Sequence, residues 1–227
     1  MYWITGCLLM VASLLPGVAE LPGHKATNDF SPRSLVEASY HAAQSLNSYT
    51  YRLTSITRHR GYDGRYKSEK KNVLAYAFRK PDQIRLAWLE PRRKRGQLAV
   101  YNGKGLRAAT SWLPFAVSVD PDSPTGKDDF HHPIYRSSLA SLMGILRQDL
   151  AKVTEERYEG LVAVGQRRAH RVVLYTAEKR VVVVIDSEHL LPLSIEQYDR
   201  ESGLLFDAGY FEDMNLNPTL DDSLFDL

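Results

Sequence analysis

The sequence predicts an α+β fold in which a strongly curved antiparallel sheet, an unclosed β-barrel, has helices covering its concave face. Three observations predict this class: short stretches alternate apolar and polar residues, turn residues join these stretches directly, and only two stretches have helical spacing. Strands joined by tight turns pair antiparallel. A sheet of about nine or ten such strands twists enough that it must curl or close.

Length, charge and the N-terminal pattern predict one exported domain. The 227 residues suffice for one domain with a core, and a formal net charge of +2 does not favour nucleic acid as a partner. An uncharged apolar run over residues 7–15, a Pro-Gly break and the small residues Gly17 and Ala19 are typical of a secretory signal peptide. We therefore expect a signal peptide over residues 1–19 and a single domain over residues 20–227.

Cys7 is the single cysteine of the chain and stands in the string ITGC, which is similar to the box around a lipidated cysteine. Only six residues precede it, and the apolar run that should come before such a cysteine lies after it. We therefore expect Cys7 to be part of the signal peptide and not a lipid anchor. A cut after Ala19 leaves no cysteine, so the mature domain would depend on its core and not on disulfides.

The first element expected in the domain is an amphipathic helix. In the string SPRSLVEASYHAAQSL, Ser31 is suited to cap the helix and Pro32 to occupy its first position. Apolar residues then recur at helical spacing, at Leu35, Ala38, Ala42 and Leu46. This spacing predicts a helix of about four turns with one apolar face.

Four hairpin-linked strands are expected next. The first two alternate large apolar residues with small or polar ones on either side of an Asp63-Gly64 turn. The apolar positions are Tyr49, Tyr51, Leu53, Leu74, Tyr76 and Phe78. The basic string RRKRG and an Asn102-Gly103 turn separate the later strands. Together they predict an antiparallel meander.

The third of these strands lies in the string RKPDQIRLAWLEP, residues 79–91. A corner at Lys80-Pro81-Asp82 turns the chain into the strand, and the last proline ends it. Ile84, Leu86 and Trp88 alternate with other residues, so they share one face of the strand. This face needs a covering element or a ligand.

The second half of the chain is expected to form a long loop, a second helix and further strands. Residues 111–133 hold four prolines and predict a loop. Residues 134–153 predict a second amphipathic helix with a broad apolar stripe. The stripe includes Leu139, Leu142, Met143 and Leu146. The last third alternates in the manner of strands, with turns at residues 186–188 and 202–203.

A resemblance to a known family rests on the strings RKPDQIRLAWLEP, QLAVYNGKGL, VVVVIDSEHLLPLSIEQYD and YFEDMNLNPTLDDSLFDL. With the order of the elements, they resemble the bacterial outer-membrane lipoprotein carrier superfamily, the LolA-, LolB- and RseB-like proteins, over most of residues 31–227. In that superfamily a strand ending in a basic residue and proline leads to a strand with tryptophan, an NG or DG hairpin follows, and an Asn-Pro segment closes the domain. The chain looks like a sibling branch of outer-membrane lipoprotein-sorting proteins.

The resemblance implies a LolA-like half-barrel in the periplasm, with a helical lid over a hydrophobic cavity for acyl chains. The cavity residues it implies are Ile84, Leu86, Trp88, Leu139, Leu142, Met143 and Leu146. Arg79 and Lys80 would lie at the rim of the concave face and contact the lid. In the carrier the residue before this proline is arginine, whereas Lys80 is a point charge without the planar fork.

Two interpretations of the apolar residues remain open at this stage, a ligand cavity and plain core, because packed strand faces are the commoner case. A cavity favours a periplasmic carrier or binding protein for lipid or lipoprotein acyl chains. Burying ~16 carbons would contribute roughly 12 kcal/mol before ordering costs, at about 0.8 kcal/mol per methylene. A filled core favours an RseB-like envelope sensor that binds a protein. We expect a monomer in either case, with transient membrane-surface contact through Arg92, Arg93, Lys94 and Arg95.

Patterns for catalysis or metal binding are weak. Residues 128–132 read DDFHH, but adjacent histidines in a loop do not point at one ion. Residues 186–192, DSEHLLP, are expected to form a turn, and Ser137 and Ser138 have no nucleophile-elbow context. The chain has no phosphate-binding loop motif and no dinucleotide-binding motif. We therefore expect no enzyme activity, no metal and no cofactor.

Overall fold

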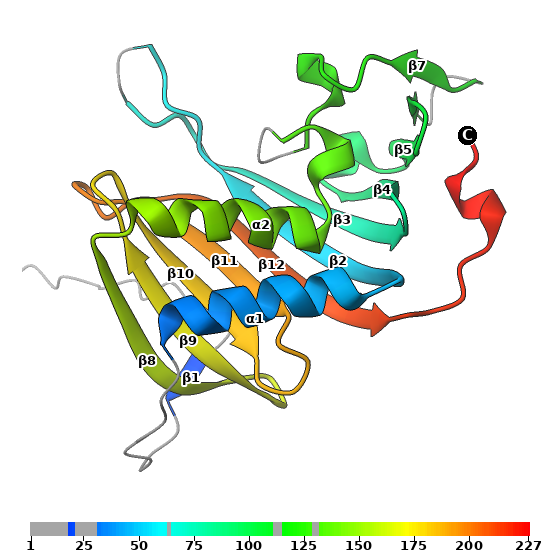
Figure 1. Cartoon of the computed structure of the whole chain (residues 1–227). Helices are drawn as coiled ribbons and strands as arrows, with labels where there is room; N and C mark the ends of the chain where they lie inside the picture. The colour runs from blue at the N-terminus through cyan, green and yellow to red at the C-terminus, as the bar shows by residue number, and fades with distance from the viewer. Residues whose placement is uncertain (1–17, 21–30, 63–64, 111–114, 129–131) are drawn as a thin grey trace, which may run out of the picture.

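The computed structural model of the chain describes residues 18–20, 31–62, 65–110, 115–128 and 132–227. In this part of the chain, twelve strands form one sheet, and two α-helices lie on one of its faces (Figure 1). The helices are α1 (Pro32–Ser45) and α2 (Leu139–Asp149). The strands are β1 (Val18–Glu20), β2 (Ser48–Thr57), β3 (Lys70–Arg79), β4 (Gln83–Glu90), β5 (Leu98–Asn102), β6 (Leu106–Ala109), β7 (Val117–Val119), β8 (Glu155–Val164), β9 (Arg167–Tyr175), β10 (Lys179–Asp186), β11 (Pro192–Asp199) and β12 (Leu205–Leu216). Five short 3-10 turns complete the order, at η1 (Arg92–Lys94), η2 (Pro124–Gly126), η3 (Ile134–Arg136), η4 (Leu150–Lys152) and η5 (Asp222–Phe225).

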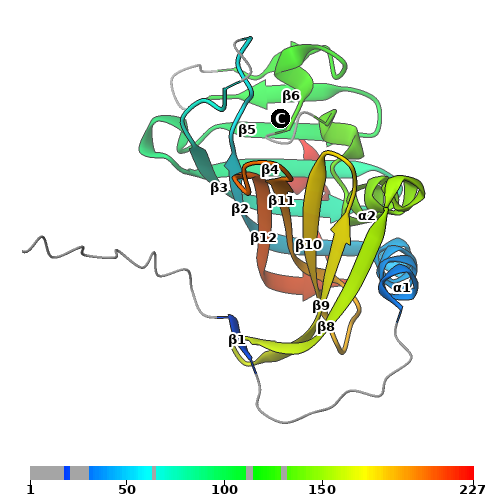
Figure 2. The ribbon, with the colours of Figure 1, turned by 90° about the vertical axis from the view of Figure 1, so that its left-hand side faces the viewer.

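The sheet is antiparallel throughout and is not closed. Its strand order is β1-β8-β9-β10-β11-β12-β2-β3-β4-β5-β6-β7, so β1 and β7 are its two edges. Figure 2 shows that β2 to β6 run in a clearly different direction from β8 to β10, which gives the sheet its strong curvature. The predicted α+β class with an unclosed, curved sheet is therefore confirmed.

The number of strands exceeds the expected nine or ten because β1 and β7 have only three residues each. β7 and η2 lie within residues 111–133, where the sequence predicted a loop. The predicted cut after Ala19 falls inside β1, which pairs with β8 through Val18 and Val164. Residues 1–17 lie outside the described residues, so the signal peptide and the role of Cys7 stay predictions.

The register of β2, β3 and β4 places one row of side chains on the concave face. β2 and β3 pair over their whole length, from Ser48 opposite Arg79 to Thr57 opposite Lys70, as predicted for a hairpin. The Asp63-Gly64 turn itself lies outside the described residues. On the concave face the rows across the three strands are Tyr49–Phe78–Ile84, Tyr51–Tyr76–Leu86 and Leu53–Leu74–Trp88.

Helix α1 begins where the sequence predicted, and α2 does not. The Ser31 side chain accepts a hydrogen bond of 3.1 Å from the Ser34 amide, which caps α1. The second helix was predicted over residues 134–153, but α2 begins five residues later. Ser138 is extended and its hydroxyl accepts from the Ser141 amide at 3.1 Å, so it caps α2 and separates it from η3. The predicted helix was longer than α2 because it included the apolar residues of the 3-10 turns η3 and η4.

The two helices pack side by side and divide the concave-face core into two clusters. Gly144 of α2 faces the Tyr40 ring of α1, and a Cβ there would lie only 3.3 Å from that ring. One cluster lies between α2 and strands β2 to β5, and the other lies between both helices and strands β9 and β10. On the opposite, convex face, Phe225 of η5 packs on Ala77 and Val100. None of the described helices is long and apolar enough to cross a membrane.

Candidate ligand-binding site beneath helix α2

Aromatic rings from β2, β3 and β12 cover the concave face; we call them the aromatic ladder. Tyr51 and Tyr76 stack with ring centroids 4.5 Å apart, and Tyr49 stacks on Phe78 at 4.8 Å. Phe211 meets Tyr51 edge to face at 5.3 Å. Both stacked pairs follow from the register, since side chains directly opposite on neighbouring strands are in contact. The sequence placed the β2 and β3 rings on one strand face but did not identify them as part of a site.

Two tyrosine hydroxyls of the ladder hold the beginning of α2. The Leu139 amide donates a hydrogen bond of 2.8 Å to the Tyr49 hydroxyl, which satisfies one of the free N–H groups at the start of the helix. The hydroxyls of Tyr76 and Ser137 lie 3.2 Å apart. Burial, and next the nearby Tyr76, raise the pKa of Tyr49 well above its usual value, so this hydroxyl stays neutral. The ladder therefore both forms the floor of the site and anchors its lid, helix α2.

All seven predicted cavity residues lie on the concave side of the sheet or on the facing helix. Ile84, at 0% exposure, and Leu86, at 2%, are fully packed in the first cluster together with Leu139. Trp88 and Leu142 are partly buried against the same cluster. Met143 and Leu146 lie in the second cluster, beside α1. The structure therefore brings these residues together in two groups and not around one open cavity.

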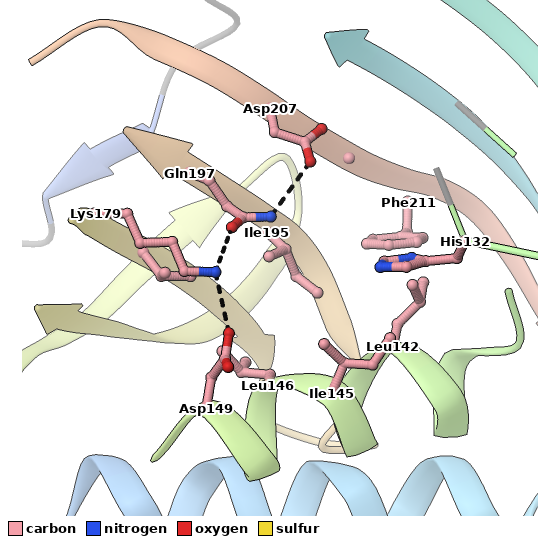
Figure 3. Close-up of a pocket in the computed structure, with 12 residues that line it drawn as sticks. His132, Leu142, Ile145, Leu146, Asp149, Lys179, Ile195, Gln197, Asp207 and Phe211 are labelled. Atoms are coloured by element: carbon pink, nitrogen blue, oxygen red, sulfur yellow. Dashed lines mark hydrogen bonds and ion pairs between the residues drawn. The ribbon is translucent and has the colours of Figure 1, made fainter. Parts of the chain in front are cut away.

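Two small cavities lie on either side of Leu142. The larger, of about 70 Å³, lies between α2 and strands β10 to β12 (Figure 3). Its apolar lining consists of Leu142, Ile145, Leu146, Val181, Ile195 and Phe211. The smaller, of about 20 Å³, is lined by Tyr51, Leu53, Leu74, Tyr76, Leu86, Trp88, Asp128, Ser137 and Leu142. Ligand pockets are usually ~300–1,000 Å³. An acyl chain would therefore enter only if α2 moved away from the sheet.

A chain of polar side chains closes one end of the larger cavity. Lys179 Nζ donates to Asp149 Oδ2 at 3.0 Å and to Gln197 Oε1 at 2.8 Å, and Gln197 Nε2 donates to Asp207 Oδ2 at 3.3 Å (Figure 3). Burial acts to raise the pKa of Asp149, but hydrogen bonds from Lys152 and Lys179 outweigh it and lower that pKa below its usual value. The end of α2 is thus joined to β10 by an ion pair, and through hydrogen bonds of Gln197 to β11 and β12. Sequence reasoning missed these residues, because they are far apart in the chain.

Arg79 and Lys80, both predicted at the rim of the concave face, point to opposite faces. Lys80 Nζ donates to the Gln44 carbonyl oxygen at 2.8 Å, so it contacts α1 and not the lid helix α2. Arg79 contacts the C-terminal segment: its guanidinium lies 2.7 Å from Asp222 Oδ1 and 4.9 Å from the centre of the Phe225 ring. The predicted rim position of Arg79 is therefore wrong, because alternation along β3 turns this side chain to the convex face.

The basic turn, residues 92–95, lies at the end of β4. Arg92, Arg93 and Arg95 are exposed, whereas Lys94 lies over the Trp88 ring at 5.8 Å. Leu89, just before the turn, is also exposed. The turn therefore presents positive charge beside an apolar side chain.

The weaker candidates have structural roles in the described part of the chain. Ser138 caps α2, and the Asp186 carboxylate accepts the amides of Glu188 and His189 at 2.9 and 2.8 Å, which forms the predicted turn. Asp128 Oδ1 accepts the His132 amide at 2.9 Å. Residues 129–131 of the DDFHH string lie outside the described residues. Among the residues that are described, no three acidic, histidine or cysteine side chains are placed to hold a metal.

No family model and no curated protein matches the chain. Solved structures do match it. The Mycobacterium tuberculosis lipoprotein LppX is 10% identical, with a TM-score of 0.55 over 86% of this chain and 99% of LppX. An uncharacterised conserved protein from Thermus thermophilus is 11% identical, with a TM-score of 0.54 over 87% of this chain and 94% of that one.

A third match is MucB of Pseudomonas aeruginosa in its complex with MucA, 14% identical with a TM-score of 0.52 over 86% of this chain. The match covers only 60% of the MucB chain. At these identities the likeness concerns the fold alone. The chain therefore shares its fold with LppX and MucB, and its unclosed, curved sheet is the one that the sequence resemblance implied.

Proposed function

We propose that the protein binds an acyl chain of a lipid or lipoprotein between the sheet and α2, as a carrier in the periplasm. The observation that carries this proposal is the pair of cavities on either side of Leu142, on an apolar concave face covered by a separate helix. The lining consists of apolar side chains with a few polar groups that mostly bond to one another. Such a lining suits binding better than catalysis.

The lid is held by a small number of polar contacts. Among the described residues they include the Tyr49 and Tyr76 hydroxyls at its start, the Lys179–Asp149 pair at its end, and an ion pair of 2.8 Å between Arg147 and Glu37 of α1. The Arg147–Glu37 pair is largely exposed, and exposed pairs stabilise by ~1 kcal/mol or less. An acyl chain that replaces the apolar contacts between α2 and the sheet offsets the cost of opening. The fold therefore supports a lid that an apolar ligand can displace.

The proposal is tested with Trp88 as a reporter. Trp112 is replaced by phenylalanine, so that after signal-peptide removal Trp88 alone emits, and the protein is titrated with methyl palmitate and with a short polar analogue. We expect a blue shift with methyl palmitate only. Leu142→Phe, which fills the space between the cavities without adding a tryptophan, should abolish the response, whereas the volume-conserving Leu142→Met should retain it. Absence of any shift, together with absence of a co-purifying lipid in native mass spectrometry, would contradict the carrier function.

A second function, an envelope sensor that binds a protein, is favoured by one observation. MucB, which shares the fold, was solved in complex with MucA. If native mass spectrometry shows no lipid and cross-linking in the periplasm instead captures a protein on the concave face, this second function replaces the first. We also propose that the basic turn brings the protein transiently to an anionic membrane surface, where a lipid could be taken up or released.

A further inference from the structure

Two buried hydrogen-bond donors beside the smaller cavity have no partner in the described residues. They are the hydroxyl of Tyr51, a residue only 4% exposed, and Nε1–H of Trp88, an atom shielded from solvent. Both residues line the cavity of about 20 Å³. They come from β2 and β4, so two strands each contribute to this cavity a residue with an unsatisfied donor.

This arrangement differs from the rest of the aromatic ladder. The hydroxyls of Tyr49 and Tyr76 are engaged by Leu139 and Ser137. The other aromatic residue that β3 contributes to the ladder is Phe78, which stacks on Tyr49 and has no hydroxyl to satisfy. A buried donor without a partner loses its hydration and regains nothing, so it destabilises the free protein unless another group satisfies it.

We propose that the Tyr51 hydroxyl and Trp88 Nε1–H bind the carbonyl oxygen of an ester or amide at the head of the acyl chain. This inference rests on the proposed function and adds to it that the protein recognises acylated compounds, not hydrocarbon chains alone. The indole N–H can only donate, so the group that satisfies both donors is an acceptor, and a carbonyl oxygen has two lone pairs for them.

The surroundings favour a neutral carbonyl over the carboxylate of a free fatty acid. Asp128 also lines the smaller cavity, and its negative charge disfavours a second anion there. The smaller cavity holds one polar group, since a single water needs ~10–15 Å³. The hydrocarbon would then extend past Leu142, which borders both cavities, toward Phe211 and Ile145 in the larger one.

The experiment compares methyl palmitate with methyl hexadecyl ether, which lacks the carbonyl oxygen, by displacement of a fluorescent acyl probe from the full mature protein. We expect the ester to bind about tenfold more tightly, the effect of one to two hydrogen bonds. Tyr51→Phe and Trp88→Phe should each reduce this ratio severalfold while the ether binds as before. Tyr158→Phe is the matched control, because its hydroxyl lies 3.0 Å from His170 Nδ1 and the residue lines neither cavity, and it should leave the ratio unchanged.

The unliganded variants give a second readout. Tyr51→Phe should unfold at the same or a higher urea concentration than the wild type, whereas Tyr49→Phe should unfold at a lower one. Equal affinity for ester and ether, or a ratio that neither donor variant changes, would overturn the inference and leave the proposed function standing. A Tyr51→Phe variant that unfolds at a clearly lower urea concentration would also overturn it, since the hydroxyl would then have a partner in the free protein. If neither compound binds, the proposed function fails and the inference fails with it.

Discussion

The Lys80 ammonium donates a hydrogen bond of 2.8 Å to the carbonyl oxygen of Gln44, in the last turn of α1. The last carbonyl groups of a helix have no partner within the helix, and its C-terminus attracts positive charge. Lys80 thereby fastens α1 to the corner between β3 and β4. Since α1 packs against α2, this contact also limits how far the helices can move from the sheet.

Lys80→Met keeps the aliphatic stem and removes the charge. We expect it to lower the free energy of unfolding by about 0.5–1 kcal/mol, because Lys80 is exposed and such contacts are weak at the surface. We also expect a faster release of bound acyl probe, measured by stopped-flow exchange. Lys80→Arg, which keeps the charge, should behave like the wild type. Unchanged release in Lys80→Met would show that α1 does not restrain the lid.

Arg79→Ala should release the C-terminal segment from the convex face and leave the ligand site intact. The variant loses bonds to Gln83 Oε1 at 2.7 Å and to the Leu220 carbonyl at 3.0 Å, and we expect a loss of about 1–2 kcal/mol in unfolding free energy. Limited proteolysis should then cut near η5. Asp222→Asn is the control, with little effect, because the Asp222 side chain is 90% exposed. If Arg79→Ala alters acyl exchange without earlier cleavage, our placement of this residue is wrong.

We expect His170 to make the stability of the protein depend on pH near neutrality. Burial first, and then Arg168, lower the pKa of His170 below its usual 6.5, although Asp186 opposes them. The unfolded chain therefore takes up a proton, as pH falls below about 6.5, before the folded protein does. The free energy of unfolding should therefore decrease as pH falls from 7 through 6.5 toward the lowered pKa of His170. His170 contributes at most about 1.4 kcal/mol per pH unit to this decrease.

The measurement is urea unfolding of wild type and His170→Gln at several pH values between 7 and 5. The variant should lose this part of the pH dependence. Tyr158→Phe removes the hydroxyl 3.0 Å from His170 Nδ1 but leaves the histidine buried, so its pH dependence should persist. Parallel curves for the wild type and His170→Gln would assign the effect to other groups.

The basic turn should govern binding to anionic membranes. Replacing Arg92, Arg93 and Arg95 by glutamine should lower partitioning into vesicles containing phosphatidylglycerol by roughly 100-fold, at about 1 kcal/mol for each cation. Binding of the wild type should weaken as salt increases. The control is a second triple variant, in which Arg157, Arg168 and Arg200 are replaced by glutamine. It loses the same charge elsewhere on the protein. If both triple variants lose binding equally, net charge and not the turn is responsible.

Local patterns predicted most of the fold. Alternation predicted the four strands β2 to β5 and the face they share, and Ser31-Pro32 predicted the first residue of α1. The start of α2 was misplaced because the apolar spacing continues through η3, and the Ser138 cap was not recognised. Arg79 and Lys80 are consecutive, and consecutive residues of a strand point to opposite faces of the sheet. Their placement on opposite faces could therefore have been predicted from the sequence.

The details of the site depend on contacts that no local pattern contains. That Ile84 and Leu86 face inward follows from alternation, but that they are packed depends on residues of α2 some fifty positions away. Lys179, Asp149 and Asp207 meet only after α2 docks on the sheet. Whether the Tyr51 hydroxyl and Trp88 Nε1–H find hydrogen-bond partners depends on the positions of all the neighbouring residues. This can therefore be read only from the folded structure.

The aromatic ladder also gives the molecule an optical probe of its own. Stacked rings held in one asymmetric arrangement produce near-ultraviolet circular dichroism, which disappears when packing is lost while the backbone structure remains. Tyr49, Tyr51, Tyr76 and Phe78 are stacked under the lid, and two of their hydroxyls anchor it. Movement of α2 should therefore change the tyrosine dichroism without any label, and with no change in the far-ultraviolet spectrum of the sheet.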